Sequence, residues 1–165
     1  MSKVFDTRVT TRMAERSKLS TAELLEVLFV QYGASSVDLA QLTKTTRTDV
    51  HNWYHGRTEP YPANTSVLVR LTAFLDVVRE ERPDQEPMGW MESYLPLPAG
   101  FNINPLSLYY EGRLSALGSY LTGEISVEEM LDAVRPSWRD QRSPWEAFTD
   151  TDGMRSLRLR EHGLT

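Results

Sequence analysis

The side chains best suited to contact a partner lie in the segment RTDVHNWYH, which begins at Arg47. In a helix, Val50 and Trp53 would share one face, because they are three positions apart. Arg47, Thr48 and Asn52 fall outside that face, and their guanidinium, hydroxyl and amide groups form directional hydrogen bonds. The segment therefore predicts a helix with one face for the core and another face for a partner.

The sequence carries no arrangement typical of an enzyme. It lacks the G-x-S-x-G, P-loop, G-x-G-x-x-G and H-E-x-x-H motifs. His51 and His55 have the spacing of two zinc ligands on a helix, but the chain has no cysteine and only one further histidine. We therefore expect no enzymatic activity, no metal site and no cofactor.

Two amphipathic helices are expected to position this segment. Ser20 and Glu23 form an S-x-x-E capping box, which predicts a helix that ends before Gly33. A cap at Thr65 or Ser66 predicts a longer helix that ends before the next proline. Both helices carry apolar residues at helical spacing, so they would provide the core on which the segment packs.

A tight link is predicted between two short helices in the middle of this region. The first short helix starts at Ser35 or Ser36 and ends near Thr43, and the second has Thr46 as its N-cap. The three-residue link 43–45 is too short for antiparallel neighbours. It favours the near-perpendicular crossing of a helix-turn-helix, whose second helix would read the DNA major groove.

The helix pair resembles the lambda-repressor-like helix-turn-helix family, also called Cro/CI or Xre. The chain departs from the family pattern at the turn, where Lys44 stands in place of the usual glycine and Thr45 in place of an apolar residue. A left-handed conformation at Lys44 would cost about 1 kcal/mol, which a folded domain can tolerate. The resemblance covers about residues 20–82 and implies a five-helix DNA-binding domain. The residues that match the pattern in register are Leu39-Ala40, Leu42, Thr46, Val50, Trp53, Gly56-Arg57 and Pro60.

The resemblance also implies which side chains read the bases. Arg47, Thr48 and Asn52 fall at the family's base-reading positions, and His51 is a weaker candidate for the same role. The chemistry agrees, because arginine can form two hydrogen bonds with guanine and asparagine two with adenine. Asp49 would repel phosphate and is expected to serve the first helical turn. An ordinary solvated helix face is the alternative interpretation of these residues.

Phosphate contacts are expected from a second set of residues. Arg8, Arg12 and Arg16 are four positions apart, so a helix would align them on one face as a basic arm. A frayed or solvated N-terminus explains these three arginines equally well. Within the region that resembles the family, the candidate phosphate contacts are Ser36, Thr46 and Arg57.

Charge is distributed unevenly along the chain. The net charge is −5, yet residues 1–70 carry nine basic and seven acidic residues, a net +2. Residues 71–165 carry nine basic and sixteen acidic residues, a net −7. DNA binding must therefore depend on a local basic surface in the first half.

The second half is expected to be mainly helical, with a helix from Pro105 that could break at Gly112 or Gly118. Ser126 caps a further helix, and a terminal β-hairpin could turn around residues 149–153. The preceding Pro-rich segment is too apolar for a solvated linker and should pack onto a core or form an interface. The fold class is thus mostly α, in four parts: a basic N-terminal arm or helix (1–19), a helix-turn-helix domain (20–82), a Pro-rich apolar joint (83–104) and a C-terminal oligomerisation or effector domain (105–165).

The sequence therefore predicts a regulator that binds double-stranded DNA and represses transcription by occluding a promoter. The overall layout resembles actinobacterial prophage repressors. The alternative is an Xre-type antitoxin, which would mask a partner protein with its acidic half and repress its own promoter. The chain shows neither a signal peptide nor an apolar run able to span a bilayer, so we expect a cytoplasmic protein without membrane contact. A homodimer and a monomer that uses the basic arm both remain open.

Overall fold

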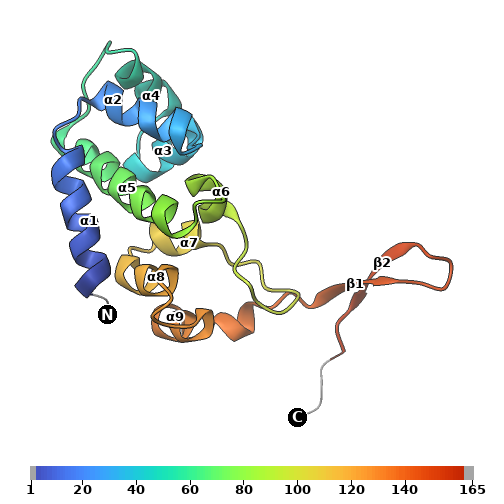
Figure 1. The fold of residues 1–165 in the computed structure, drawn as a ribbon. Helices are drawn as coiled ribbons and strands as arrows, with labels where there is room; N and C mark the ends of the chain where they lie inside the picture. Colours follow the sequence, from blue (N-terminus) through green and yellow to red (C-terminus); the bar gives the residue numbers. More distant parts are fainter. Residues whose placement is uncertain (1–2, 162–165) are drawn as a thin grey trace.

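The computed structural model describes residues 3–161, and its long central helix, α5 (Pro62–Glu81), packs against at least four other helices. Helix α1 (Lys3–Arg16) runs along one flank of α5, and α2 (Thr21–Glu26) packs near its beginning (Figure 1). From Leu68 to Val78 nearly every residue of α5 is buried. None of the described helices is both long and apolar enough to cross a membrane.

The capping box predicted at the start of α2 is present. The Ser20 side chain accepts a hydrogen bond from the Glu23 amide, and the Glu23 carboxylate accepts one from the Ser20 amide. The helix continues without a gap into a π-helical turn, η1 (Val27–Gln31), before Gly33 takes a positive φ of 74°. The prediction of a single helix before Gly33 is thus correct in extent, but its last turn is π-helical.

Helix α5 begins earlier than the predicted cap at Thr65 or Ser66. Pro62 occupies its first turn, where a fixed φ suits the helix and the missing N–H costs nothing. The hydroxyl of Ser66 instead donates to the carbonyl of Pro62, four residues earlier, at 3.1 Å. The sequence offers two possible helix starts here, and the helix begins at the proline, so that the hydroxyl residues lie inside it.

The Pro-rich joint packs onto the core, as expected, and contains a short helix that the sequence did not predict. This helix, α6 (Pro87–Glu92), buries Met88, Trp90 and Met91. The Met88 amide donates to the carbonyl of Tyr32 at 3.0 Å, which ties the joint to the end of η1. Because the buried side chains from Phe5 to Trp138 form one continuous cluster, the joint and the helices beyond it share a core with the first half.

The predicted helix from Pro105 is broken, as its glycines allowed. It forms α7 (Pro105–Tyr110) and α8 (Leu114–Leu121), and Gly112 between them has a φ of 77°. Gly118 does not break the chain but lies inside α8 against α1, where an added Cβ would approach the Phe5 ring to 2.2 Å. The missing side chain at Gly118 therefore allows α1 and α8 to pack closely.

The chain ends in a β-hairpin that projects from the helical body (Figure 1). Strands β1 (Trp145–Thr149) and β2 (Arg155–Leu159) pair antiparallel, which confirms the predicted terminal hairpin within a mostly helical fold. Its register places Trp145 opposite Leu159, and these side chains are 51% and 61% exposed. The remaining elements are α3 (Ser36–Thr43), α4 (Arg47–Tyr54), α9 (Val127–Val134), which carries the predicted Ser126 box, and the 3-10 turn η2 (Trp138–Gln141).

Candidate nucleic-acid interface

Helices α3 and α4 are each fixed at their start by a side-chain cap. The Ser35 hydroxyl accepts from the Asp38 amide at 3.1 Å, and the Thr46 hydroxyl accepts from the Asp49 amide at 3.1 Å. Each carboxylate in turn accepts from the backbone amide of its cap residue. Two reciprocal boxes therefore set where both helices begin, in agreement with the predicted starts.

The turn between the two helices uses a left-handed lysine. Lys44 has φ 54° and ψ 43°, the left-handed conformation considered for this position from the sequence. Its amide donates to Gln41 at 3.3 Å, and the Thr45 amide donates to Ala40 at 2.9 Å, which satisfies the last carbonyls of α3. The hydroxyls of Thr43 and Thr45 lie 2.7 Å apart and add a polar contact across the turn.

Apolar side chains fix the orientation of the pair. Leu39 of α3 and Val50 of α4 are fully buried, and Trp53 is nearly so. Val50 and Trp53 define the buried face of α4, and Leu39 is buried on the neighbouring helix α3, so the core sets which face of α4 points outward. The polar residues predicted to contact a partner accordingly lie on the outward face.

The structure brings the four candidate base-reading residues together on α4. Arg47, Thr48 and His51 are exposed, and Asn52 is half-buried beside them. The Arg47 guanidinium also donates through Nε to the Ser36 hydroxyl at 3.4 Å, so the first residues of α3 and α4 meet. This contact places one predicted base contact beside one predicted phosphate contact.

Thr46 has less freedom to meet a phosphate than its sequence position suggested. Its hydroxyl donates to the Asp49 carboxylate at 2.7 Å while it accepts from the Asp49 amide. The side-chain hydrogen bond from Thr46, followed by the backbone one, lowers the pKa of Asp49. Both residues are therefore engaged in capping α4, the role expected for Asp49.

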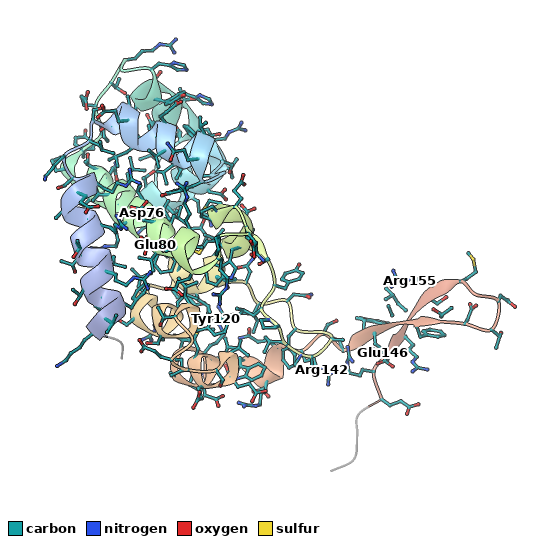
Figure 2. The ribbon with its side chains drawn as sticks, in the orientation of Figure 1. Asp76, Glu80, Tyr120, Arg142, Glu146 and Arg155 are labelled. Atoms are coloured by element: carbon teal, nitrogen blue, oxygen red, sulfur yellow. The ribbon has the colours of Figure 1, made fainter. Side chains whose placement is uncertain are left out.

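Arg8, Arg12 and Arg16 have acidic partners inside the protein, which the sequence did not indicate. Arg8 donates to Glu80 at 2.6 Å and to Glu81 at 2.5 Å, and Arg12 also pairs with Glu80. All three arginines pair with acids of α5, so they lie along the flank of α1 that packs on α5. Figure 2 labels two of these acids on α5, Asp76 and Glu80. The N-terminal segment is thus a packed helix, neither a frayed end nor an extended arm.

The third of these arginines forms the most buried pair. The Arg16 guanidinium donates two hydrogen bonds to the Asp76 carboxylate, from Nε at 2.9 Å and from a terminal nitrogen at 2.7 Å. The Asp76 side chain is 8% exposed. The hydroxyl of Tyr32 donates to the same carboxylate. Asp76 therefore joins α1, η1 and α5 at one point in the core.

Three cations near α3 and α4 have no such partner. Lys44, Arg47 and Arg57 are exposed and form no ion pair with any residue between 3 and 161. Lys44 is the C-cap residue of α3, three positions before Arg47, and the family pattern indicated no role for its charge. These three charges are consequently not neutralised by an ion pair within the described residues.

His51 and His55 do not form a metal site with other residues. Their rings are stacked with centroids 6.4 Å apart, and the described residues contain no group of three potential metal-binding side chains.

In comparisons with known proteins, no family model matches the chain, and no curated protein or solved structure matches it significantly. The function is therefore argued from the outward face of α4.

Proposed function

We propose that the protein is a sequence-specific DNA-binding regulator of the helix-turn-helix class, in which α4 enters the major groove. The observation that carries the proposal is the polar face of α4, with Arg47, Thr48 and Asn52 held by buried side chains on the opposite face. An α-helix fits the major groove, where each base pair presents a distinct pattern of donors and acceptors. Three hydrogen-bonding side chains on one helix face suit that pattern.

In this proposal the cation that follows α4 binds the DNA backbone. Arg57 comes three residues after the end of α4, so its charge lies close in the chain to the base-reading residues. Ser36 at the start of α3 is a second backbone contact, and His51 is a secondary base contact. Arg8, Arg12 and Arg16 are left out, because their charges are already neutralised by α5.

The biological role we propose is repression, in which the bound protein occludes a promoter. Selection of bound duplexes from a random pool, followed by gel shifts at two salt concentrations, tests DNA binding. We expect one enriched motif that binds at least a thousandfold more tightly than a scrambled duplex, a ratio typical of specific binding. Equal affinity for both duplexes, or no binding at low salt, would contradict the proposal. The stoichiometry of the enriched complex then separates a dimer on a palindrome from a monomer on an asymmetric site.

A second candidate function is that of an antitoxin-like interaction protein, and the projecting hairpin favours it. Its β1–β2 face exposes Trp145, Leu157 and Leu159, at 51%, 68% and 61%. Large apolar side chains are rarely grouped on a surface that contacts nothing. Stoichiometric co-purification with a protein encoded beside this one would support that candidate, provided that the complex is lost in the Trp145→Ser, Leu157→Ser double variant.

A further inference from the structure

A cavity of about 200 Å³ lies where the end of α3 and its turn meet α5 and the α7–α8 junction. It joins the first half of the chain to the second, because Lys44 and Arg70 line it from one side and Tyr109, Tyr110 and Gly112 line it from the other. Drug-sized ligands occupy about 300–1,000 Å³. Any ligand of this cavity is therefore small.

Two positive charges in this cavity have no counter-charge. Lys44 and Arg70 are exposed, and neither forms an ion pair or side-chain hydrogen bond with another residue of the described chain. Burial raises the pKa of Tyr109, and the positive charge of Arg70 offsets part of that effect. Arg70 and Tyr109 also line the same cavity, so both side chains border the space that a ligand would occupy.

Tyr109 supplies a hydrogen-bond donor that is also unused. The side chain is 7% exposed, and its ring packs edge-on against Phe74 with centroids 5.1 Å apart. Its hydroxyl forms no hydrogen bond within residues 3–161. Among residues 3–161 the one fully enclosed side-chain polar atom without a partner is Oγ of Ser119, so the Tyr109 hydroxyl is not fully enclosed and a ligand can reach it. The cavity thus combines an unpartnered phenol with two unpaired cations.

Two acidic side chains act on Tyr110, another residue that lines the cavity. Burial, followed by the negative charges of Asp38 and Glu92, raises the pKa of Tyr110 to about 12. Neither acid lines the cavity, but both act on the Tyr110 side of it. A ligand with one anionic head and a neutral body suits this polarity, whereas an extended dianion does not.

We propose that this cavity binds a small organic anion, a carboxylate or phosphate monoester whose head lies between Lys44, Arg70 and Tyr109. The compact neutral body would rest beside Tyr110 and the apolar side chains of Leu42 and Leu114. Both head groups share the chemistry of an oxyanion that accepts charge-assisted hydrogen bonds.

Such a ligand would connect the turn before α4 to the C-terminal helices. Lys44 is the left-handed residue of that turn, and Gly112 is the left-handed residue between α7 and α8. The effect on DNA binding rests on the function proposed above: a ligand that favours one arrangement of the turn changes DNA affinity, and DNA changes ligand affinity by the same factor. Binding of the ligand alone does not depend on that function.

Calorimetric titration of the full chain, without DNA, tests the site. The probes are benzoate and phenyl phosphate, with benzyl alcohol and benzylamine as neutral and cationic controls. We expect at least one anion to bind at one site per chain, at least tenfold more tightly than either control. The tighter of the two anions identifies the head group. Failure of both anions, or equal binding of benzyl alcohol, overturns the proposal.

Variants distinguish binding in the cavity from a general attraction of anions to the positive charges of the protein. Tyr109→Phe removes only the hydroxyl and keeps the ring that packs on Phe74, so we expect a folded protein with about fivefold weaker binding. Arg70→Gln should weaken binding at least tenfold. The matched control is Arg155→Gln, which removes an exposed, unpaired arginine from the distant hairpin (Figure 2) and should change nothing. Equal losses in Arg70→Gln and Arg155→Gln would refute a specific site.

The competing occupant of these cations is the DNA backbone. If Arg70→Gln weakens DNA binding as much as Arg57→Ala when no small anion is present, Arg70 belongs to the DNA interface and the ligand proposal is overturned. Saturable anion binding by a protein that fails to bind DNA would support the cavity and refute the DNA-binding function, so the two failures are distinguishable.

Discussion

Two sets of cations in this protein have similar residue types and opposite environments. Arg8, Arg12 and Arg16 of α1 lie against acids of α5. The cations around α4, by contrast, are exposed and unpaired within the described part of the chain; they are Lys44, Arg47 and Arg57. The first set stabilises helix packing, and the second remains available for an outside partner.

The difference lies in the partner helix and not in the arginines. Asp76 and Glu80 are four positions apart on α5, the same spacing that separates Arg12 from Arg16 on α1. Matched spacing lets two helices form a ladder of ion pairs across their contact. A row of arginines at helical spacing therefore indicates a basic face, and only the opposite surface decides whether that face meets a helix or a phosphate.

The largest expected effect comes from breaking the buried pair. Arg16→Ala should lower the free energy of unfolding by about 3–5 kcal/mol, because the Asp76 carboxylate is left buried without its cation. Urea denaturation at pH 7 measures the change. Arg57→Ala is the matched control and should leave the unfolding midpoint unchanged. If Arg16→Ala is as stable as the parent but binds DNA more weakly, Arg16 contacts DNA and the proposed division between packing cations and DNA-binding cations is wrong.

Local signals allowed much of the fold to be predicted from the sequence. The boxes at Ser20, Thr46 and Ser126 were predictable because each is complete within four residues. The terminal hairpin was predictable for the same reason, since its turn lies between two short apolar segments. Helix α6 was not, because it is only six residues long and Gly89 inside it disfavours a helix; Pro87 suits its first turn, and burial of its apolar side chains against the core stabilises it.

The candidate site was only partly predictable. The face of α4 could be identified because Val50 and Trp53 mark the opposite, buried side. The partners of Arg8 lie 72 and 73 positions away in the sequence. No local pattern connects residues at that separation, so one sequence leaves their pairing undetermined. The same holds for Arg70 and Tyr109, which meet at one cavity only after the second half packs on the first.

The second prediction concerns the exposed cations around α4 that form no ion pair within the described residues. Arg47→Ala should weaken binding to the selected duplex by about 1–3 kcal/mol and relax the preference at one base pair, because a bidentate contact is lost. Quantitative gel shifts against the motif and its single-base variants measure both effects. Arg155→Ala, which removes an exposed arginine from the distant hairpin, serves as control. A loss that is equal at every base pair would assign Arg47 to the backbone.

The third prediction separates backbone contact from base contact. Arg57→Ala should weaken all duplexes alike, by about 1 kcal/mol, because a phosphate contact carries no sequence information. The slope of log affinity against log salt should fall by about 1, since one fewer counterion is released. Fluorescence anisotropy over a salt series measures the slope. A changed base preference would contradict the assignment of Arg57.

The smallest expected effect concerns the exposed ion pairs between α1 and α5, which Glu80 forms with Arg8 and Arg12. Burial opposes ionisation of Glu80, but hydrogen bonds from Arg8 and Arg12 outweigh it and lower the pKa of Glu80. The carboxylate therefore stabilises the folded state above the ordinary glutamate pKa of about 4.5, and this contribution is lost as the pH falls through the lower folded-state value. Because the side chain is 38% exposed, the contribution should be under about 1 kcal/mol.

Glu80→Gln tests this last step. At pH 7 the variant should be slightly less stable than the parent, and the difference should vanish in acid, where Glu80 of the parent is also neutral. Urea denaturation from pH 7 to pH 3 measures it, with Glu59→Gln as a control that lacks an ion pair in the described chain. A difference that persists unchanged in acid would mean that Glu80 acts through packing. The exposed pairs of Arg8 and Arg12 with Glu80 would then hold α1 against α5 through packing contacts, and only the buried Arg16–Asp76 pair would do so through its charges.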